Sequence, residues 1–297
     1  EYLFPKISDF GLSKIIDEES MKLLSGFKGT YAYSSPEMFE NKYSKAGDVY
    51  AFGIIVYEII TGDQPYGNIS PYQLLAEVPC GLRPEFKFEI PKCYKNLIET
   101  CWSNNPDERP TFEEIVEQLK NKEEFITENV DIDEFMNYVE YVEDSQNNFI
   151  IKSFDPIYEN SNVQIVDLNK YKLLEKIDDQ PNFEKFKIVC KNTNKKYIAK
   201  ISKLKITKIT KYGLINLSRE VNLIWQINHP SFLKFIGYSP LNFQSKQNLV
   251  IVTESASKGS LKNILNSLKE NNENSQWNDT NKLIIICNHF KFNKNMQ

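Results

Sequence analysis

The sequence predicts an α+β fold in which a helical first part precedes an antiparallel sheet. Two observations support this prediction. Apolar residues recur at helical spacing over residues 45–62, and Gly62 and Pro65 supply stop signals for that helix. In the second part, three short runs of strand-forming residues follow in meander order, at 171–177, 185–190 and 197–202.

Composition narrows the class of protein. At 297 residues the chain has room for about two domains, and 41% hydrophobic residues are ample for cores. A net charge of -4 gives no electrostatic case for nucleic acid or an anionic membrane. Five scattered cysteines without metal-type spacing indicate reduced thiols. No apolar run has the length of a membrane span, so we expect a cytoplasmic protein.

Local signals then fix the helices of the first part. The helix at 45–62 is apolar on nearly every side, which predicts a buried central position. Ser70-Pro71 predicts the start of a short helix ending at Glu77, and a further helix is expected over 92–103. Thr111 opens a last helix through a capping box with Glu114.

An acidic stretch separates the two parts of the chain. Over residues 121–162 acidic side chains dominate, which predicts a solvated linker with a short helix around residues 134–141, or else a docking site for a basic partner. Beyond the three predicted strands we expect two more, over 232–238 and 249–254. Helices are expected over 217–227, after Ser260, and over 282–286.

Three short motifs in the first part resemble the activation segment of protein kinases: Asp9-Phe10-Gly11, Gly29-Thr30 and Ser35-Pro36-Glu37. The resemblance implies that Asp9 binds magnesium, that Thr30 lines the substrate site, and that Glu37 forms a buried ion pair with Arg109. It also implies that Asp48 holds the backbone of a catalytic loop. Without the motif, Asp48 reads as a solvated residue at a helix N-terminus.

The second part resembles the front of a protein kinase domain. Ile198-Ala199-Lys200-Ile201 is similar to the strand-three lysine motif, which implies that Lys200 binds the phosphates of ATP and pairs with Glu220. Thr253 matches the gatekeeper position at the end of the predicted strand 249–254. The backbone of Glu254 to Ala256 would then contact adenine, so the resemblance implies ATP and Mg as cofactors.

The resemblance yields a domain prediction. Residues 1–120 correspond to a kinase C-lobe, 121–167 to an acidic linker, 168–290 to a kinase N-lobe and the start of a C-lobe, and 291–297 to a tail. The fold expected is protein-kinase-like, with a mostly helical C-lobe part and a five-stranded antiparallel N-lobe with one main helix, both domains being incomplete. Cys101-Trp102 and Arg109-Pro110 resemble tyrosine-kinase-like C-lobes, and Gly29-Thr30 resembles serine/threonine kinases.

Two departures from the family pattern bear on function. Where the family pattern has three glycines in the phosphate-covering loop, we expect Asp178, Gln180 and Glu184, with Phe183 at the tip. Carboxylates there would repel ATP. In addition, the sequence contains no His-Arg-Asp catalytic loop, so the base aspartate is absent.

Three hypotheses follow. The chain is a piece of a tandem kinase that transfers the γ-phosphoryl group of ATP to serine or threonine of a protein substrate, and is inactive as this fragment. Alternatively it is a pseudokinase module that binds a signalling partner. The third hypothesis is a truncated product that folds poorly and aggregates through exposed apolar surface.

Overall fold

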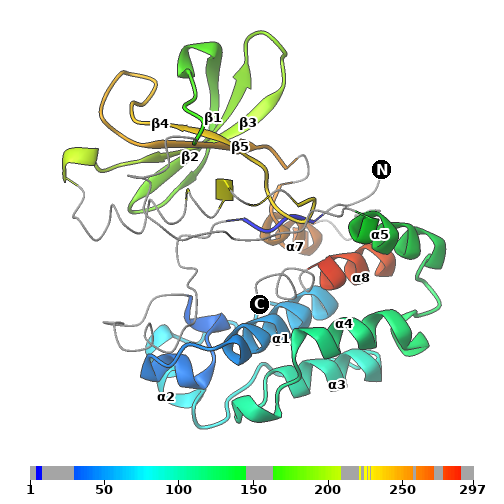
Figure 1. The fold of residues 1–297 in the computed structure, drawn as a ribbon. Coiled ribbons are helices and arrows are strands. Elements are labelled where there is room, and N and C mark those ends of the chain that lie inside the picture. The colour runs from blue at the N-terminus through cyan, green and yellow to red at the C-terminus, as the bar shows by residue number, and fades with distance from the viewer. Residues whose placement is uncertain are drawn as a thin grey trace.

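The computed structural model describes residues 5–8, 30–144, 163–208, 221, 224–225, 227, 229–256, 259–270 and 277–288. Two lobes lie one above the other, a sheet lobe and a helical lobe (Figure 1). The predicted α+β architecture, with a mostly helical part and a five-stranded antiparallel sheet, is confirmed. No helix among the described residues is long and apolar enough to cross a membrane.

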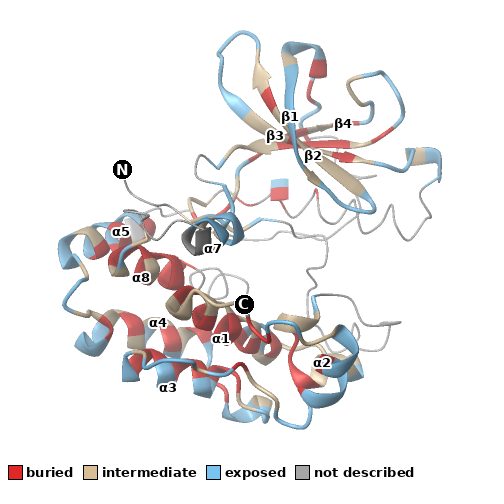
Figure 2. Cartoon of the chain, turned by 180° about the vertical axis from the view of Figure 1, so that it is seen from behind, coloured by how far each residue is buried: buried red, intermediate tan, exposed pale blue. Residues whose placement is uncertain are grey.

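The helical lobe is built around α1, which Figure 2 shows as a largely buried helix surrounded by the others. Their bounds agree with the predicted positions to within a few residues. The helices are α1 (Lys45–Thr61), α2 (Pro71–Glu77), α3 (Lys92–Cys101), α4 (Phe112–Asn121), α5 (Ile132–Asp144) and α8 (Asp279–Asn288), with α7 (Leu261–Glu270) between the lobes.

Capping residues set the ends of these helices. The Ser44 hydroxyl accepts a hydrogen bond from the Gly47 N–H and begins α1, and Gly62 ends it in the left-handed region at φ 71°. The predicted capping box of Thr111 with Glu114 is present at α4, and a second one lies at α2. The apolar faces of α1, α3 and α4 then pack into one core.

The sheet lobe is a five-stranded antiparallel sheet with the order β1-β2-β3-β5-β4. Its predicted strands are confirmed, although β4 begins three residues later than expected. The bounds are β1 (Tyr171–Asp179), β2 (Phe183–Cys190), β3 (Lys196–Ser202), β4 (Phe235–Ser239) and β5 (Val250–Glu254). The predicted main helix of this lobe is described only at residues 221, 224–225 and 227.

A short stretch before β1 covers the outer face of the sheet. Val166 and Leu168 pack there with Ile188 and Ala199, and all four are buried. The stretch approaches so closely that a Cβ at Gly237 of β4 would lie 2.5 Å from the Gln164 carbonyl oxygen. Residues 163–167, which we predicted as linker, therefore pack as part of the sheet lobe.

The acidic stretch contains more packed structure than its composition predicts. The short helix expected around 134–141 is longer, at 132–144, and it packs instead of lying in solvent. Its apolar residues at helical spacing explain this, since Phe135, Tyr138, Val139 and Val142 are all at most 5% exposed. The domain boundaries themselves stay predictions.

Helix α8 joins the two parts of the chain. It is reached only after the sheet, yet Leu283, Ile284 and Ile286 are fully buried in the same core as α1. On its other side it contacts α5, where Thr280 Oγ1 accepts from the Asp131 N–H at 2.7 Å. The helical lobe is therefore completed by residues more than 200 positions after its first helix.

Gly53 allows α1 and α3 to approach each other. A Cβ at this position would lie 2.8 Å from the Cys101 Cβ, closer than carbon atoms tolerate. We predict that Gly53→Ala lowers the free energy of unfolding by about 1–3 kcal/mol, measured by urea denaturation. Helix propensity alone predicts the opposite sign, a gain of about 1 kcal/mol.

The control is Ala51→Gly on the same helix, which reports the effect of helix propensity without a new Cβ at the α1–α3 contact. A Gly53→Ala protein as stable as the parent, or more stable, would show that the two helices do not pack as closely as described.

Candidate functional site

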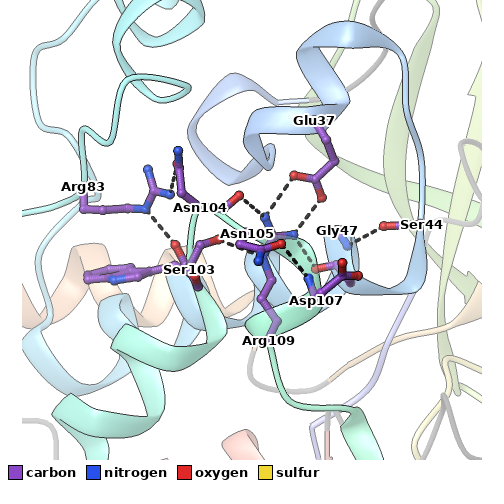
Figure 3. Close-up of polar contacts among 11 residues, drawn as sticks. Glu37, Ser44, Gly47, Arg83, Ser103, Asn104, Asn105, Asp107 and Arg109 are labelled. Carbon is purple, nitrogen blue, oxygen red and sulfur yellow. Dashed lines mark hydrogen bonds and ion pairs between the residues drawn. The ribbon is translucent and has the colours of Figure 1, made fainter.

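The ion pair that the resemblance implies, between Glu37 and Arg109, is present. The Arg109 guanidinium donates to both carboxylate oxygens of Glu37, at 2.7 and 2.9 Å (Figure 3). It also donates to the backbone carbonyls of Ala46 and Ser103, each at 2.9 Å. The Arg109 side chain is fully buried and that of Glu37 is 14% exposed, so this is a buried and well-satisfied pair.

Local structure places both partners. Glu37 lies in a 3-10 helix, Pro36–Glu40, which ends at Asn41 in the left-handed conformation. Arg109 follows the 3-10 helix Pro106–Glu108, begun by Asn105, whose side chain accepts from the Asp107 N–H. The guanidinium then stacks 5.2 Å from the centre of the Tyr50 ring of α1.

The electrostatics of the pair favour its charged form. Burial acts to raise the pKa of the Glu37 carboxyl, but the hydrogen bonds from Arg109 outweigh it and hold the pKa below its ordinary value. The pair is therefore ionised at neutral pH and fastens the segment of residues 36–40 to the end of α3.

Asp48 lies in the first turn of α1, with its side chain reached by water. It makes no side-chain hydrogen bond or ion pair with any residue in the described ranges. The protein around it nevertheless raises the pKa of its carboxyl to about 6 by burial.

One polar contact in this region has no counterpart in our sequence analysis. Tyr33 donates its hydroxyl to the carboxylate of Glu58 on α1 at 2.7 Å, and burial together with Glu58 raises the pKa of that hydroxyl. A sequence signal was available, because Glu58 is the one charged residue of α1 after Asp48. A charge in an otherwise apolar helix requires a partner.

Lys200 lies on β3 as predicted, directly opposite Lys185 of β2. Its ammonium group is 4.5 Å from the centre of the Phe183 ring. Phe183 is not at the tip of the loop, as we expected, but is the first residue of β2, since Gln180–Asn182 make the turn. The aromatic ring therefore lies beside the lysine that is predicted to bind phosphate.

Lysines neutralise the acidic side chains of this loop. Lys176 lies 2.6 Å from both Asp179 and Glu184, and Lys203 forms an ion pair with Asp179 as well. Asp178 is 3.9 Å from Lys185. The carboxylates that we expected to repel ATP are thus partly compensated within the sheet lobe.

The predicted gatekeeper and hinge residues lie at the end of β5. Thr253 is half-buried and pairs with Ile198 across the sheet. Glu254 accepts from the Lys6 ammonium at 2.6 Å and from the Lys234 N–H at 3.0 Å. Ala256 is exposed and lies beyond the strand pairing, which leaves its backbone outside the ladder.

The contact of Lys6 with Glu254 belongs to a larger junction. Ile7 forms a parallel bridge with Phe232, which joins the residues just before Asp9 to the sheet lobe. Pro5 accepts a hydrogen bond from Asn288 of α8 at 2.8 Å. Residues 5–8 thus contact both lobes, and sequence reasoning had assigned them no such role.

Two of the predicted site residues, Asp9 and Glu220, lie outside the described residues. Thr30 is exposed and precedes the 3-10 helix Tyr31–Tyr33, and its carbonyl oxygen accepts from the Tyr33 N–H at 3.0 Å. Of the remaining predictions, Glu37, Asp48 and Arg109 gather around the start of α1, while Lys200, Thr253 and Glu254 lie on the sheet.

Part of the chain matches a known protein family. Residues 2–119 match the family described as protein tyrosine and serine/threonine kinase. The match covers less than half of the chain and shows that its first part is similar to protein kinases. This first part contains the Glu37–Arg109 pair.

Similar curated proteins are themselves named as kinases. A probable LIM domain-containing serine/threonine-protein kinase of Dictyostelium discoideum is 41% identical over 123 residues, which is 41% of this chain and 19% of that protein. The serine/threonine-protein kinase VIK of Arabidopsis thaliana is 35% identical over 124 residues, covering 40% and 28%. The dual specificity protein kinase shkD of Dictyostelium discoideum is 38% identical over 117 residues, covering 38% and 16%.

The chain therefore spans less than a third of the length of these relatives. Protein kinases in general use ATP and Mg²⁺ and act on proteins.

We predict that Glu37→Gln lowers the free energy of unfolding by about 3 kcal/mol, because it leaves the buried charge of Arg109 without its counter-ion. Chemical denaturation of the full chain at pH 7 measures this. The matched control is Glu40→Gln, which breaks the exposed pair of Glu40 with Lys42 and should change nothing measurable. Equal effects of the two substitutions would contradict a special role for the buried pair.

Asp48 should make stability fall as the pH rises. Its folded-state pKa of about 6 lies above the ordinary value of 3.8, so ionisation is less favourable in the folded protein. The contribution of Asp48 to stability is then greatest below pH 4 and is lost as the pH rises past 6. We predict that Asp48→Asn raises the melting temperature at pH 8 and leaves it unchanged at pH 4.

Asp133→Asn, in the first turn of α5, controls for the general effect of a carboxylate at a helix N-terminus. If the melting temperature of the Asp48→Asn protein at pH 8 does not exceed that of the parent, the raised pKa of Asp48 is contradicted.

Proposed function

We propose that the chain is part of a protein kinase whose intact form transfers the γ-phosphoryl group of ATP to serine or threonine of a protein substrate. Asp9 would hold magnesium, Lys200 with Glu220 would position the phosphates, and the backbone around Glu254 to Ala256 would bind adenine. The Glu37–Arg109 pair would anchor the activation segment. Membership of the tyrosine-kinase-like group and the C-lobe and N-lobe assignments belong to the same proposal.

The observation that best supports this proposal is the junction at residues 5–8. Lys6 pairs with Glu254 and Ile7 pairs with Phe232, so the chain just before Asp9 runs against the lobe that carries Lys200. A magnesium ligand and a phosphate-binding lysine must lie on either side of the same triphosphate. The packing of residues 5–8 against the sheet lobe thus supports a proposed site in which Asp9 and Lys200 act on the same nucleotide.

We further propose that this 297-residue chain alone does not catalyse transfer. The sequence contains no His-Arg-Asp motif to supply a base aspartate.

A pseudokinase module is the second candidate, and one observation favours it. The Phe183 ring lies 4.5 Å from the Lys200 ammonium, in the region where a kinase binds phosphate. The neighbouring loop carries carboxylates instead of glycines, so its backbone cannot approach a nucleotide as closely. Such a lobe would act by binding a signalling partner.

The deciding experiment measures transfer of labelled phosphate from MgATP to a general acceptor protein such as casein. We expect none from the 297-residue chain. We expect transfer to serine and threonine by the longer native protein that contains it, and loss of that transfer in its Asp9→Ala variant.

Robust transfer by the short chain that disappears on Asp9→Ala would contradict the proposed inactivity. A longer native protein that transfers nothing, while folding normally, would contradict the kinase proposal and favour the pseudokinase.

A further inference from the structure

Charge is distributed unevenly over the two lobes, although the net charge of the whole chain is only -4. Residues 30–144 contain 23 acidic and 9 basic residues. Residues 168–208, which form β1 to β3, contain 12 lysines and 4 acidic residues. The sheet lobe therefore offers a strongly positive surface that the overall composition conceals.

One cavity of about 360 Å³ lies in this positive region. It is formed by the end of β3, the segment that follows it, and the hairpin between β4 and β5. Glu184 and Ile201, which are cross-strand partners, lie at its base. Ile201 and Lys200 are consecutive in β3 and so point to opposite faces, which puts this cavity on the other side of the sheet from the predicted nucleotide site.

Lysines dominate the charge of the cavity. Its lining contains Lys203, Lys205 and Lys246, and the only acidic side chain in it is Glu184. Glu184 is already paired with Lys176 at 2.6 Å, and Lys203 with Asp179. Lys205 and Lys246 form no ion pair with any residue in the part of the chain that the structure describes. Among the described residues, Lys205 and Lys246 therefore have no counter-ion at this cavity.

Buried amides hold the walls of the cavity in place. Asn248 is 8% exposed, and its side chain donates to the carbonyls of Ser202 at 2.9 Å and Lys203 at 3.3 Å. Asn242 accepts at its side-chain oxygen from the N–H groups of Gln244 and Lys246, at 2.9 and 3.1 Å. The hairpin that carries Lys246 is thus tied to the strand end that leads to Lys205, which preorganises the site.

We infer that this cavity binds a phosphate group carried by another molecule. A phosphate monoester has a charge of about -2 at pH 7 and three acceptor oxygens, which matches the ammonium groups of Lys205 and Lys246, since neither forms an ion pair among the described residues. The cavity is open to solvent, which leaves room for the group that carries the phosphate. The site shares Glu184 with the predicted phosphate-covering loop but lies on the face of the sheet opposite to Lys200, and it does not depend on the chain being a kinase.

The test is a binding titration of the full chain with three probes: inorganic phosphate, the peptide Ala-Gly-phosphoserine-Gly-Ala, and the same peptide without phosphate. We expect the phosphopeptide to bind saturably and inorganic phosphate to compete with it, while the unmodified peptide does not bind. The Lys205→Gln/Lys246→Gln substitutions should lower the affinity for the phosphopeptide by about tenfold or more. Tighter binding of the phosphopeptide than of inorganic phosphate identifies a protein-borne phosphate as the source, and equal affinity identifies free phosphate compounds.

The matched control is Lys172→Gln/Lys196→Gln, which removes the same charge from exposed positions of the same sheet outside the cavity. Its affinity should stay within about twofold of the parent's, because distant surface charges are screened by salt. Equal loss of affinity in both double variants would show that binding depends only on the overall positive charge, and it would contradict the proposed site. Failure of the phosphopeptide to saturate, or equal binding of the unmodified peptide, would overturn it as well.

Discussion

The helical lobe is closed around the guanidinium of Arg109. Once this charge is removed from water it needs a counter-ion and acceptors, and Glu37, Ala46 and Ser103 supply them from three separate segments. Each of these segments is irregular or lies at a helix end, where packing alone would fix its position poorly. One buried cation therefore sets the arrangement of the segment before α1, the start of α1 and the end of α3.

The two lobes are linked in a different way. The strands form a small core of their own on the outer face of the sheet. Helix α8, which follows the sheet in the sequence, packs its apolar side chains into the core around α1. The segment of residues 5–7 then contacts both lobes. Pro5 accepts from Asn288 of α8, Lys6 pairs with Glu254 at the end of β5, and Ile7 forms a bridge with Phe232. The boundary between the lobes therefore does not coincide with any single point in the sequence.

Much of the fold was predictable because local signals and tertiary packing agree. The caps at Ser70 and Thr111 and the runs of strand-forming residues in β2 and β3 mark elements that the structure contains. The Glu37–Arg109 pair was predictable only through family resemblance, since its partners are 72 positions apart. The packing of α5 and the place of Phe183 were not predictable. The first depends on a surface supplied by α8, and the second on where a turn of a few residues begins.

The completion of the helical core by α8 has a consequence for synthesis on the ribosome. Helix α1 is made early, but Leu283 and Ile284, which cover part of its core, are translated more than 200 residues later. At roughly 5–20 residues per second, the nascent helical lobe would wait roughly 10–45 s with that apolar surface uncovered. A long-range contact of this kind slows folding and exposes the chain to aggregation in the interval. Because of this order of segments, a chaperone during translation would be more important for this chain than the length of the chain suggests.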